Sequence, residues 1–571
     1  MPIIRFEIAE LERLLRKEVP RAELAKTIPM IGADVEDASG ETWAVEFFPD
    51  RPDLFTVEGI ARALRAWYGV DHGLRAYKAT PSGHTVTVDP SVEKVRPHIA
   101  AALMRGIEMT EARLKALIDL QEDLHWGLGA RRRRVAIGIH DAGVLAPPFT
   151  YTTWALDEKR FTPLYETKEM SPREILEAHE KGREYAHLLA GHARVPIILD
   201  TKGGVVSMPP IINAARTAVR AAAGASVGTR DVLLDVTGTD RWAVERTLNM
   251  LATALVEAGG ALESVEIVSG KTRRVSPDLT PETRELLAAE ANKLLGTSFS
   301  AEEIAEDLRR MGFGAKAHGE KIAVDVPSYR ADILHTWDLI EDVAIGHGIF
   351  RLEPTPLVAR TVGLALPESK VSEMARRSLV GLGFLETMNL TLSNERDQFT
   401  RMQRAPSPVA KVRNPVTEDT TLLRPTLLPG LMTILKKNAH RDLPQRLFEV
   451  GMVTRLDGDA VHNERHVAGV LIAGRSNFSE VKGIVLALAR DLGWTGEVAK
   501  AEDAAFVPGR CASYGGRGDG SPGKAADQQI RGVFGEVHPA VLDAFGLAHP
   551  VVAFELTLAR GPGDAVRDAR E

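Results

Sequence analysis

Helical and strand-like hydrophobic patterns alternate along the chain. Val57–Tyr68 carries apolar residues at helical spacing, and Thr56 before it is a residue type that caps helix starts. Two later segments, Arg194–Asp200 and Asp231–Asp240, contain continuous apolar runs, as expected for strands buried on both faces. The pattern therefore predicts a multidomain α+β protein.

Beyond residue 270 the pattern predicts a compact module with a winged-helix-like order of elements. We first expect a helix capped by Thr280, with Pro281 at its first position. A second helix should follow, with the capping box Ser300 and Glu303 at its start and a stop at Gly312. After it we expect a hairpin over 314–329 and then a helix that begins just after Asp332.

This last helix is acidic, with Asp332, Asp338, Glu341 and Asp342 inside eleven positions. Helical spacing puts the last three on one stripe, where like charges repel, and puts Ile333, Trp337, Ile340 and Ala344 on a buried side. A cation would remove the repulsion, and ligands that are all oxygen suit Mg²⁺ or Ca²⁺. A solvated acidic face with Asp332 as a helix cap fits the spacing equally.

The composition narrows the class of protein. A chain of 571 residues is too long for one core, and no apolar run approaches the length of a membrane span. The single cysteine, Cys511, excludes an internal disulfide framework, and the N-terminus has no signal-peptide anatomy, so we expect a cytoplasmic protein. The net charge of -7 argues against non-specific coating of nucleic acid.

One short run of basic residues is an exception to the overall negative charge. Arg131, Arg132, Arg133 and Arg134 precede an apolar strand, and they could contact phosphates or form a solvated loop. His140 follows on the same strand, where we expect it to pack rather than to catalyse.

Four separated motifs resemble the β subunit of phenylalanyl-tRNA synthetase in its archaeal or eukaryotic form. They are FFPDRPDLFTVEGIARALR (47–65), DLHWGLGARRRRVAIGIHDAGVLAPPFTYTT (123–153), PSYRADILHTWDLIEDVA (327–344) and VRNPVTEDTTLLRPTLLPGLMTILKKNAHRDLPQRLFEVG (412–451). The resemblance implies an N-terminal α/β domain (1–95), an α/β editing and tRNA-binding domain (96–268), the winged-helix-like module (269–350) and a class II synthetase-like antiparallel-sheet domain without catalytic motifs (351–571).

The resemblance also implies partners and a metal. In the family, the acids at the positions of Asp332, Asp338, Glu341 and Asp342 bind Mg²⁺ near the contact with an α subunit. The expected assembly is an α2β2 heterotetramer that binds tRNA(Phe) and does not bind a membrane.

The adenylation chemistry is expected on that α subunit. Arg455 and Asp457 lie where a class II motif two would lie, but the strand in VVAFELTLARGPG is not followed by a Gly-rich helix start with an Arg. Such a positive group is needed to neutralise the triphosphate. The complex would therefore use ATP to form Phe-tRNA(Phe) on the α subunit, with this chain required for assembly.

The activity implied for this chain is hydrolytic editing of Tyr-tRNA(Phe). A pocket for phenylalanine rejects tyrosine poorly, whereas a site that hydrogen-bonds the phenol is selective. The candidates are Ser207, Asn213, Asp235 and Thr237, of which the last two alternate on one strand face. We expect them to bind the amino acid, the terminal ribose or a water, although helix and turn capping by Ser207 and Asn213, or a satisfied strand-end carboxylate at Asp235, fits the same residues.

No Ser-His-Asp constellation is evident, which favours a positioned water over a covalent intermediate. Two other functions stay open: a stand-alone aminoacyl-tRNA editing deacylase, and a non-catalytic tRNA-binding scaffold.

Overall fold

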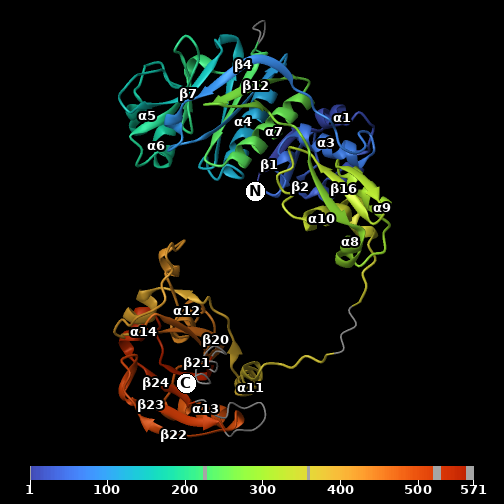
Figure 1. Ribbon diagram of the computed structural model, residues 1–571. Helices are drawn as coiled ribbons and strands as arrows, with labels where there is room; N and C mark the ends of the chain where they lie inside the picture. The colour runs from blue at the N-terminus through green and yellow to red at the C-terminus, as the bar shows by residue number, and fades with distance from the viewer. Residues whose placement is uncertain (1, 223–227, 357–360, 519–528, 561–571) are drawn as a thin grey trace. The chain divides into compact units, whose positions relative to one another are not determined.

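The computed structural model describes residues 2–222, 228–356, 361–518 and 529–560. The chain forms two compact units, residues 1–357 and 358–571. Each unit has its own sheets, with helices packed against them (Figure 1). The chain is thus a mixed α/β multidomain protein, as predicted.

The first unit begins with a three-stranded antiparallel sheet in the order β1 (Ile3–Glu7), β3 (Thr42–Phe47), β2 (Ala33–Asp37). Helices α1 (Ile8–Leu15), α2 (Arg21–Thr27) and α3 (Val57–Trp67) accompany it. The Thr56 side chain accepts a hydrogen bond from the Gly59 amide at the start of α3, so the predicted cap is confirmed.

A ten-stranded sheet forms the centre of this unit. Its order is β10 (Ile212–Asn213), β9 (Val205–Met208), β8 (Arg194–Leu199), β7 (Phe149–Ala155), β4 (Thr80–Val88), β12 (Ala261–Ser269), β5 (His98–Arg105), β11 (Val232–Gly238), β6 (Val135–Asp141), with β13 (Thr272–Ser276) paired to β12. Both predicted apolar strands are present as β8 and β11, and every residue of β11 is buried.

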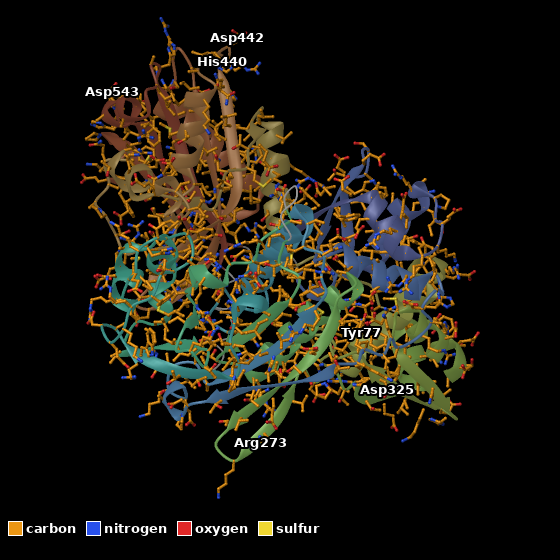
Figure 2. The ribbon with its side chains drawn as sticks, turned by 90° about the horizontal axis from the view of Figure 1, so that it is seen from above. Tyr77, Arg273, Asp325, His440, Asp442 and Asp543 are labelled. Atoms are coloured by element: carbon orange, nitrogen blue, oxygen red, sulfur yellow. The ribbon has the colours of Figure 1, made fainter. Side chains whose placement is uncertain are left out.

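Four helices accompany this sheet: α4 (Glu111–Trp126), α5 (Pro172–Ala178), α6 (Glu180–Tyr185) and α7 (Arg241–Glu257). Helix α7 packs on β5 and β11. In Figure 2 the side chain of Arg273 projects from the tip of the β12–β13 hairpin.

The module beyond residue 270 has a three-stranded sheet, β14 (Glu282–Leu287), β16 (Lys321–Val326), β15 (Gly314–His318), with α8 (Ala288–Leu295), α9 (Ala301–Arg310) and α10 (Thr336–His347). The capping box of Ser300 and Glu303 and the hairpin are confirmed. The prediction of a helix that begins after Thr280 is wrong. Residues 282–287 pair with β16 as a strand whose side chains mostly face solvent, and the helix begins only at Ala288.

The acidic helix also begins later than predicted, because His335 rather than Asp332 caps it. Its buried stripe runs through Leu339, Ile340 and Val343. Trp337 therefore lies on the outer side of the first turn, where it is 65% exposed and meets the His335 ring edge-on. The predicted burial of Trp337 is wrong.

The second unit is built on a seven-stranded sheet in the order β17 (Leu385–Glu386), β20 (Gln445–Asp457), β21 (Ala460–Ile472), β25 (Val551–Arg560), β24 (Gln529–Val537), β23 (Phe506–Gly518), β22 (Trp494–Lys500), with β18 (Leu392–Ser393) and β19 (Leu422–Leu423) paired separately. Pairing is antiparallel except between β17 and β20.

Helices cover both faces of this sheet, with α11 (Pro367–Gly381) and α13 (Phe478–Asp491) in one core and α12 (Leu428–Lys437) and α14 (Pro539–Phe545) in the other. The segment after Arg560, where a motif-three helix was expected to be missing, lies outside the described residues. Across the described residues, no helix combines the length and the apolar character needed to cross a membrane.

Candidate active site

A pocket of about 580 Å³ lies beside the ten-stranded sheet. Helix α4, strand β6 and the turn between β9 and β10 supply its walls. Most of the lining side chains are apolar, among them Leu114, Leu117, Ile118, Ile137, Ile139, Ile211 and Ile212. Three of the four predicted editing residues, Ser207, Asn213 and Asp235, line this one pocket.

The pocket forms where the two ends of the sheet meet. Strands β10 and β6 are at opposite ends of the strand order. The Asn213 amide on β10 nevertheless donates to the Ile139 carbonyl on β6 at 3.4 Å. Arg132, just before β6, donates to the Ile211 carbonyl in the β9–β10 turn at 3.1 Å. The sheet therefore curves, and residues far apart in sequence face one space.

Ser207 and Asn213 are register partners on the β9–β10 hairpin. The Ser207 hydroxyl is buried and has no hydrogen-bond partner within the described residues. A buried hydroxyl without a partner costs about 1–3 kcal/mol, unless a ligand or water supplies the missing bond. Its place in the pocket lining makes it available to a bound molecule.

Asp235 and Thr237 share one face of β11 but have different surroundings. Asp235 lines the pocket, and its Oδ2 lies 2.6 Å from Nε2 of His140. Thr237 does not line the pocket, and Arg96 donates to its hydroxyl at 3.0 Å and to its carbonyl at 2.8 Å. The structure thus brings Asp235 to Ser207 and Asn213 but places Thr237 among structural contacts.

The basic run does not act as one surface. Ala130, Arg131 and Arg132 all have positive φ, a conformation that is rare for residues other than glycine. This turn buries Arg132 against the Tyr185 ring and Glu122, whereas Arg134 pairs with Asp240 at 2.7 Å. The side chains of Arg131 and Arg133 remain exposed.

Among the lining residues that sequence reasoning missed are Glu122, Tyr165 and Lys181. Tyr165 is 81% exposed and has a φ of 71°, which is unusual for a bulky side chain. No sequence pattern distinguishes it, because the loop conformation is set by contacts with distant strands such as the Leu164 amide bond to the Asn213 carbonyl.

Glu122 brings a negative charge to the pocket wall. Burial acts to raise the pKa of Glu122, but hydrogen bonds from His125 and Arg132 outweigh it and lower the pKa to about 2. Burial lowers the pKa of His125 itself to about 4. The wall therefore carries a carboxylate held by Arg132 beside a neutral imidazole at pH 7.

The four acids of the predicted Mg²⁺ site lie apart from this pocket and do not form one ligand set. Arg330 donates to Asp332 and to Asp342, both at 2.6 Å. Asp338 instead accepts the Leu334 and His335 amides at the helix start, and Glu341 is exposed. Within the described residues no group of three or more acidic, His or Cys side chains is arranged to hold a metal. This arrangement does not fit Mg²⁺.

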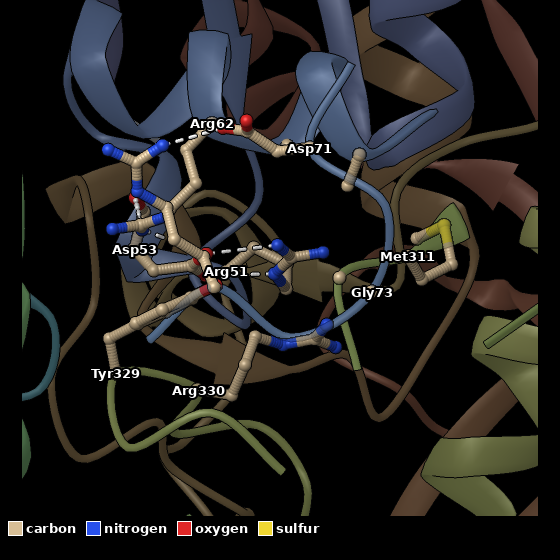
Figure 3. A pocket seen from close by; sticks show the side chains of 12 residues that line it. Arg51, Asp53, Arg62, Asp71, Gly73, Met311, Tyr329 and Arg330 are labelled. Carbon is tan, nitrogen blue, oxygen red and sulfur yellow. Dashed lines mark hydrogen bonds and ion pairs between the residues drawn. The ribbon is translucent and has the colours of Figure 1, made fainter. Parts of the chain in front are cut away.

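Arg330 belongs to a buried charged cluster between the module and α3, drawn in Figure 3. Arg51 pairs with Asp53 at 2.8 Å, and the Arg62 guanidinium lies 3.6 Å from the centre of the Tyr329 ring. Burial acts to raise the pKa of Asp53, but Arg51 outweighs it and holds the pKa at about 2. The cluster fixes the acidic segment to the N-terminal part of the unit.

Comparisons with known proteins cover almost the whole chain. A family model described as tRNA synthetase B5 domain matches residues 285–349, and one described as phenylalanyl tRNA synthetase beta chain CLM domain matches 352–558. An N-terminal fragment of the phenylalanyl-tRNA synthetase beta subunit from Pyrococcus horikoshii superposes with a TM-score of 0.57 at 34% identity, covering 61% of this chain and 100% of the fragment.

Full-length relatives agree. The phenylalanine–tRNA ligase beta subunit of Methanothrix thermoacetophila is 43% identical over 98% of this chain and 100% of its own length. That of Archaeoglobus fulgidus is 41% identical over 98% of both chains. With this identity over nearly its full length, the chain belongs to the phenylalanine–tRNA ligase beta subunit family.

Proposed function

We propose that the pocket of the ten-stranded sheet is a hydrolytic editing site for Tyr-tRNA(Phe). The chain itself serves phenylalanine–tRNA ligase as its β subunit. One observation carries the proposal: Ser207, Asn213 and Asp235, from separate strands, converge on one largely apolar pocket.

The lining suits an aromatic amino acid with one polar group. The apolar side chains of α4 and β6 offer a surface for the ring, and the volume lies within the range of small-molecule sites. The Ser207 hydroxyl, which has no hydrogen-bond partner within the described residues, can bond a phenol. Phenylalanine would leave this buried hydroxyl unpaired, and such sites discriminate strongly.

The geometry favours water as the nucleophile. Within the described residues the Ser207 hydroxyl makes no hydrogen bond to a base, and the imidazole of His140 bonds Asp235 and Thr217. A carboxylate at the pocket floor can accept a proton from a water held next to the ester carbonyl. Asp235 is therefore the residue we assign to orienting or activating that water.

The acceptor end of tRNA would enter past exposed basic and aromatic groups. Tyr165 offers a ring at the pocket lining on which an unpaired base can stack. Lys181 lines the same pocket, and Arg131 and Arg133 are exposed near its wall. These four side chains are our candidates for contacts to the acceptor end.

Synthesis of Phe-tRNA(Phe) with ATP is assigned to the α subunit, in an α2β2 assembly in the cytoplasm. The domain limits at 95, 268 and 350, with their editing, winged-helix-like and class II synthetase-like assignments, belong to the same proposal. Mg²⁺ at Asp332, Asp338, Glu341 and Asp342 stays a prediction that this arrangement does not support, because Arg330 occupies the space between two of these carboxylates. No step proposed here passes through it.

The test is hydrolysis of Tyr-tRNA(Phe) and of Phe-tRNA(Phe) by the reconstituted complex of both subunits. We expect rapid release of tyrosine and slow release of phenylalanine. Equal rates for both esters, or rates equal to those without protein, would remove the editing assignment and leave this chain with assembly and tRNA binding.

A further inference from the structure

We propose that His140 is a positioning residue that fixes the Asp235 carboxylate at the floor of the pocket. The inference rests on the editing function proposed above and adds to it a residue that does not line the pocket. His140 is fully buried behind Asp235, between β11 and the segment that follows β10.

Both imidazole nitrogens have partners. Nε2 lies 2.6 Å from Oδ2 of Asp235, and Nδ1 lies 2.9 Å from the hydroxyl of Thr217. With Nε2–H donating to Asp235, Nδ1 is an acceptor, and the Thr217 hydroxyl is the donor that faces it. A chain of hydrogen bonds therefore runs from Thr217 through His140 to Asp235.

The contact leaves one carboxylate oxygen for the pocket. Asp235 accepts its hydrogen bond from His140 through Oδ2, and across the described residues no further hydrogen bond to this side chain is found. Because Oδ2 is held, the carboxylate cannot rotate freely about its last bond. Oδ1 is then presented to a bound ester or water in one orientation.

A glycine makes room for this arrangement. Gly138 is the register partner of Asp235 on β6, and His140 follows two residues later on the same face of the strand. A Cβ atom at Gly138 would overlap with Oδ2 of Asp235 and Nε2 of His140. The Asp235 side chain can reach across β6 to the imidazole only because residue 138 has no side chain.

A buried histidine that only fills space predicts something different. If His140 served packing alone, an apolar side chain of similar size would serve as well, and a neutral donor at the position of Nε2 would bring no advantage. If it positions Asp235, the donor matters and the apolar replacement is defective. Positioning also predicts a change in kcat with little change in KM, because the pocket walls remain intact.

The experiment compares His140→Met with His140→Gln in the complete complex. Methionine fills the space without a donor, whereas the glutamine amide can donate to Oδ2. For Tyr-tRNA(Phe) hydrolysis we expect His140→Met to lower kcat by about 10- to 100-fold, the range seen when a reacting group loses its orientation. KM should stay within about twofold, and His140→Gln should recover most of the rate.

Two buried threonines supply an independent pair that does not depend on replacing the histidine. Thr217→Val removes the partner of Nδ1 and should lower kcat by roughly threefold to tenfold. Thr247→Val alters a fully buried hydroxyl on α7 and should leave the rate unchanged. Charging of tRNA(Phe) with phenylalanine should be the same in every variant and reports intact assembly.

The outcomes separate the two proposals. A wild-type complex that does not hydrolyse Tyr-tRNA(Phe) removes the editing function and this inference with it. Wild-type hydrolysis with full activity in His140→Met and Thr217→Val overturns the inference alone. Equal defects in His140→Met and His140→Gln also overturn it, since they assign His140 to packing.

Discussion

The pocket of the first unit and the central sheet of the second unit both bury polar and charged side chains, but these side chains differ in how many hydrogen-bond partners the chain gives them. In the pocket, Ser207 has a partnerless hydroxyl and Asp235 uses one carboxylate oxygen. In the second unit, Glu555 on β25 accepts the amides of Leu427 and Leu428 at 3.0–3.2 Å and binds His466 at 2.8 Å.

A second buried acid in that sheet, Glu449, also has partners within the chain. Arg424 lies 2.7 Å from one of its oxygens as an ion pair, and the Asn389 amide donates to the other oxygen at 2.6 Å. Polar groups that the chain itself satisfies hold the fold together, whereas partnerless polar groups in a pocket remain available to a ligand. The comparison assigns chemistry to the first unit and internal support to the second.

The largest effect should come from removing the pocket carboxylate. Asp235→Ala takes away the group assigned to the water, and we expect hydrolysis of Tyr-tRNA(Phe) to fall by about 10³-fold, within the range for a lost acid–base group. Tyr-tRNA(Phe) should then accumulate while Phe-tRNA(Phe) synthesis is nearly unchanged. Asp235→Asn keeps the shape and separates charge from packing. Unchanged deacylation by Asp235→Ala would remove Asp235 from the site.

The reverse pattern is expected in the second unit. Glu555→Ala leaves His466 and two amides of the α12 start without their acceptor, and breaking such a buried pair costs about 3–5 kcal/mol. Hydrogen exchange of peptides from β21 and β25 in the full chain should accelerate, while Tyr-tRNA(Phe) hydrolysis stays normal. Glu497→Ala on the exposed face of β22 is the control. Unaltered exchange in Glu555→Ala would show that the closed cluster does not support the sheet.

A pH dependence follows from the same cluster. Burial acts to lower the pKa of His466, but hydrogen bonds to Glu464 and Glu555 outweigh it and raise the pKa from 6.5 to about 9. A raised pKa stabilises the folded form fully below pH 6.5, and this contribution is lost as the pH rises through 9. The shift corresponds to roughly 3 kcal/mol.

Denaturant unfolding, monitored by hydrogen exchange of peptides in the second unit, should show this loss of stability between pH 6.5 and 9. His466→Gln should flatten the curve in this window. His125 does not interfere, because its lowered pKa of about 4 places its titration at acid pH. An equally steep curve in His466→Gln would assign the dependence to other groups.

The comparison also explains what the sequence could predict. Strands β8 and β11 of the ten-stranded sheet were predictable, because their continuous apolar runs depend on local composition. The shared face of Asp235 and Thr237 follows from strand periodicity. The different environments of Asp235 and Thr237 could not be predicted from that periodicity, because Arg96, far away in sequence, binds Thr237 outside the pocket.

The predictions of two helix starts were wrong for a related reason. Asp332 is a good capping residue by type, yet Arg330 binds its carboxylate, and His335 caps the helix instead. Thr280 and Pro281 predict a helix start, but pairing with β16 turns the next residues into a strand. In each case a tertiary contact outweighs a local preference.

The smallest effect is expected for the basic run. It tests whether exposed side chains near the pocket also bind tRNA. Arg132 and Arg134 are engaged within the protein, so only Arg131 and Arg133 remain for phosphates. A phosphate contact releases counterions, and each one lost should reduce the salt dependence of tRNA binding by about one unit of slope. The double variant Arg131→Ala/Arg133→Ala should therefore weaken tRNA(Phe) binding mainly at low salt.

Arg273→Ala, at the tip of the β12–β13 hairpin, removes another exposed arginine, one that does not line the pocket, and should leave the slope unchanged. Because the same double variant keeps Ser207, Asn213 and Asp235, its kcat for Tyr-tRNA(Phe) should match the wild type while KM rises. A slope equal to that of Arg273→Ala would confine recognition to the pocket itself, and the two exposed arginines would then be solvated turn residues.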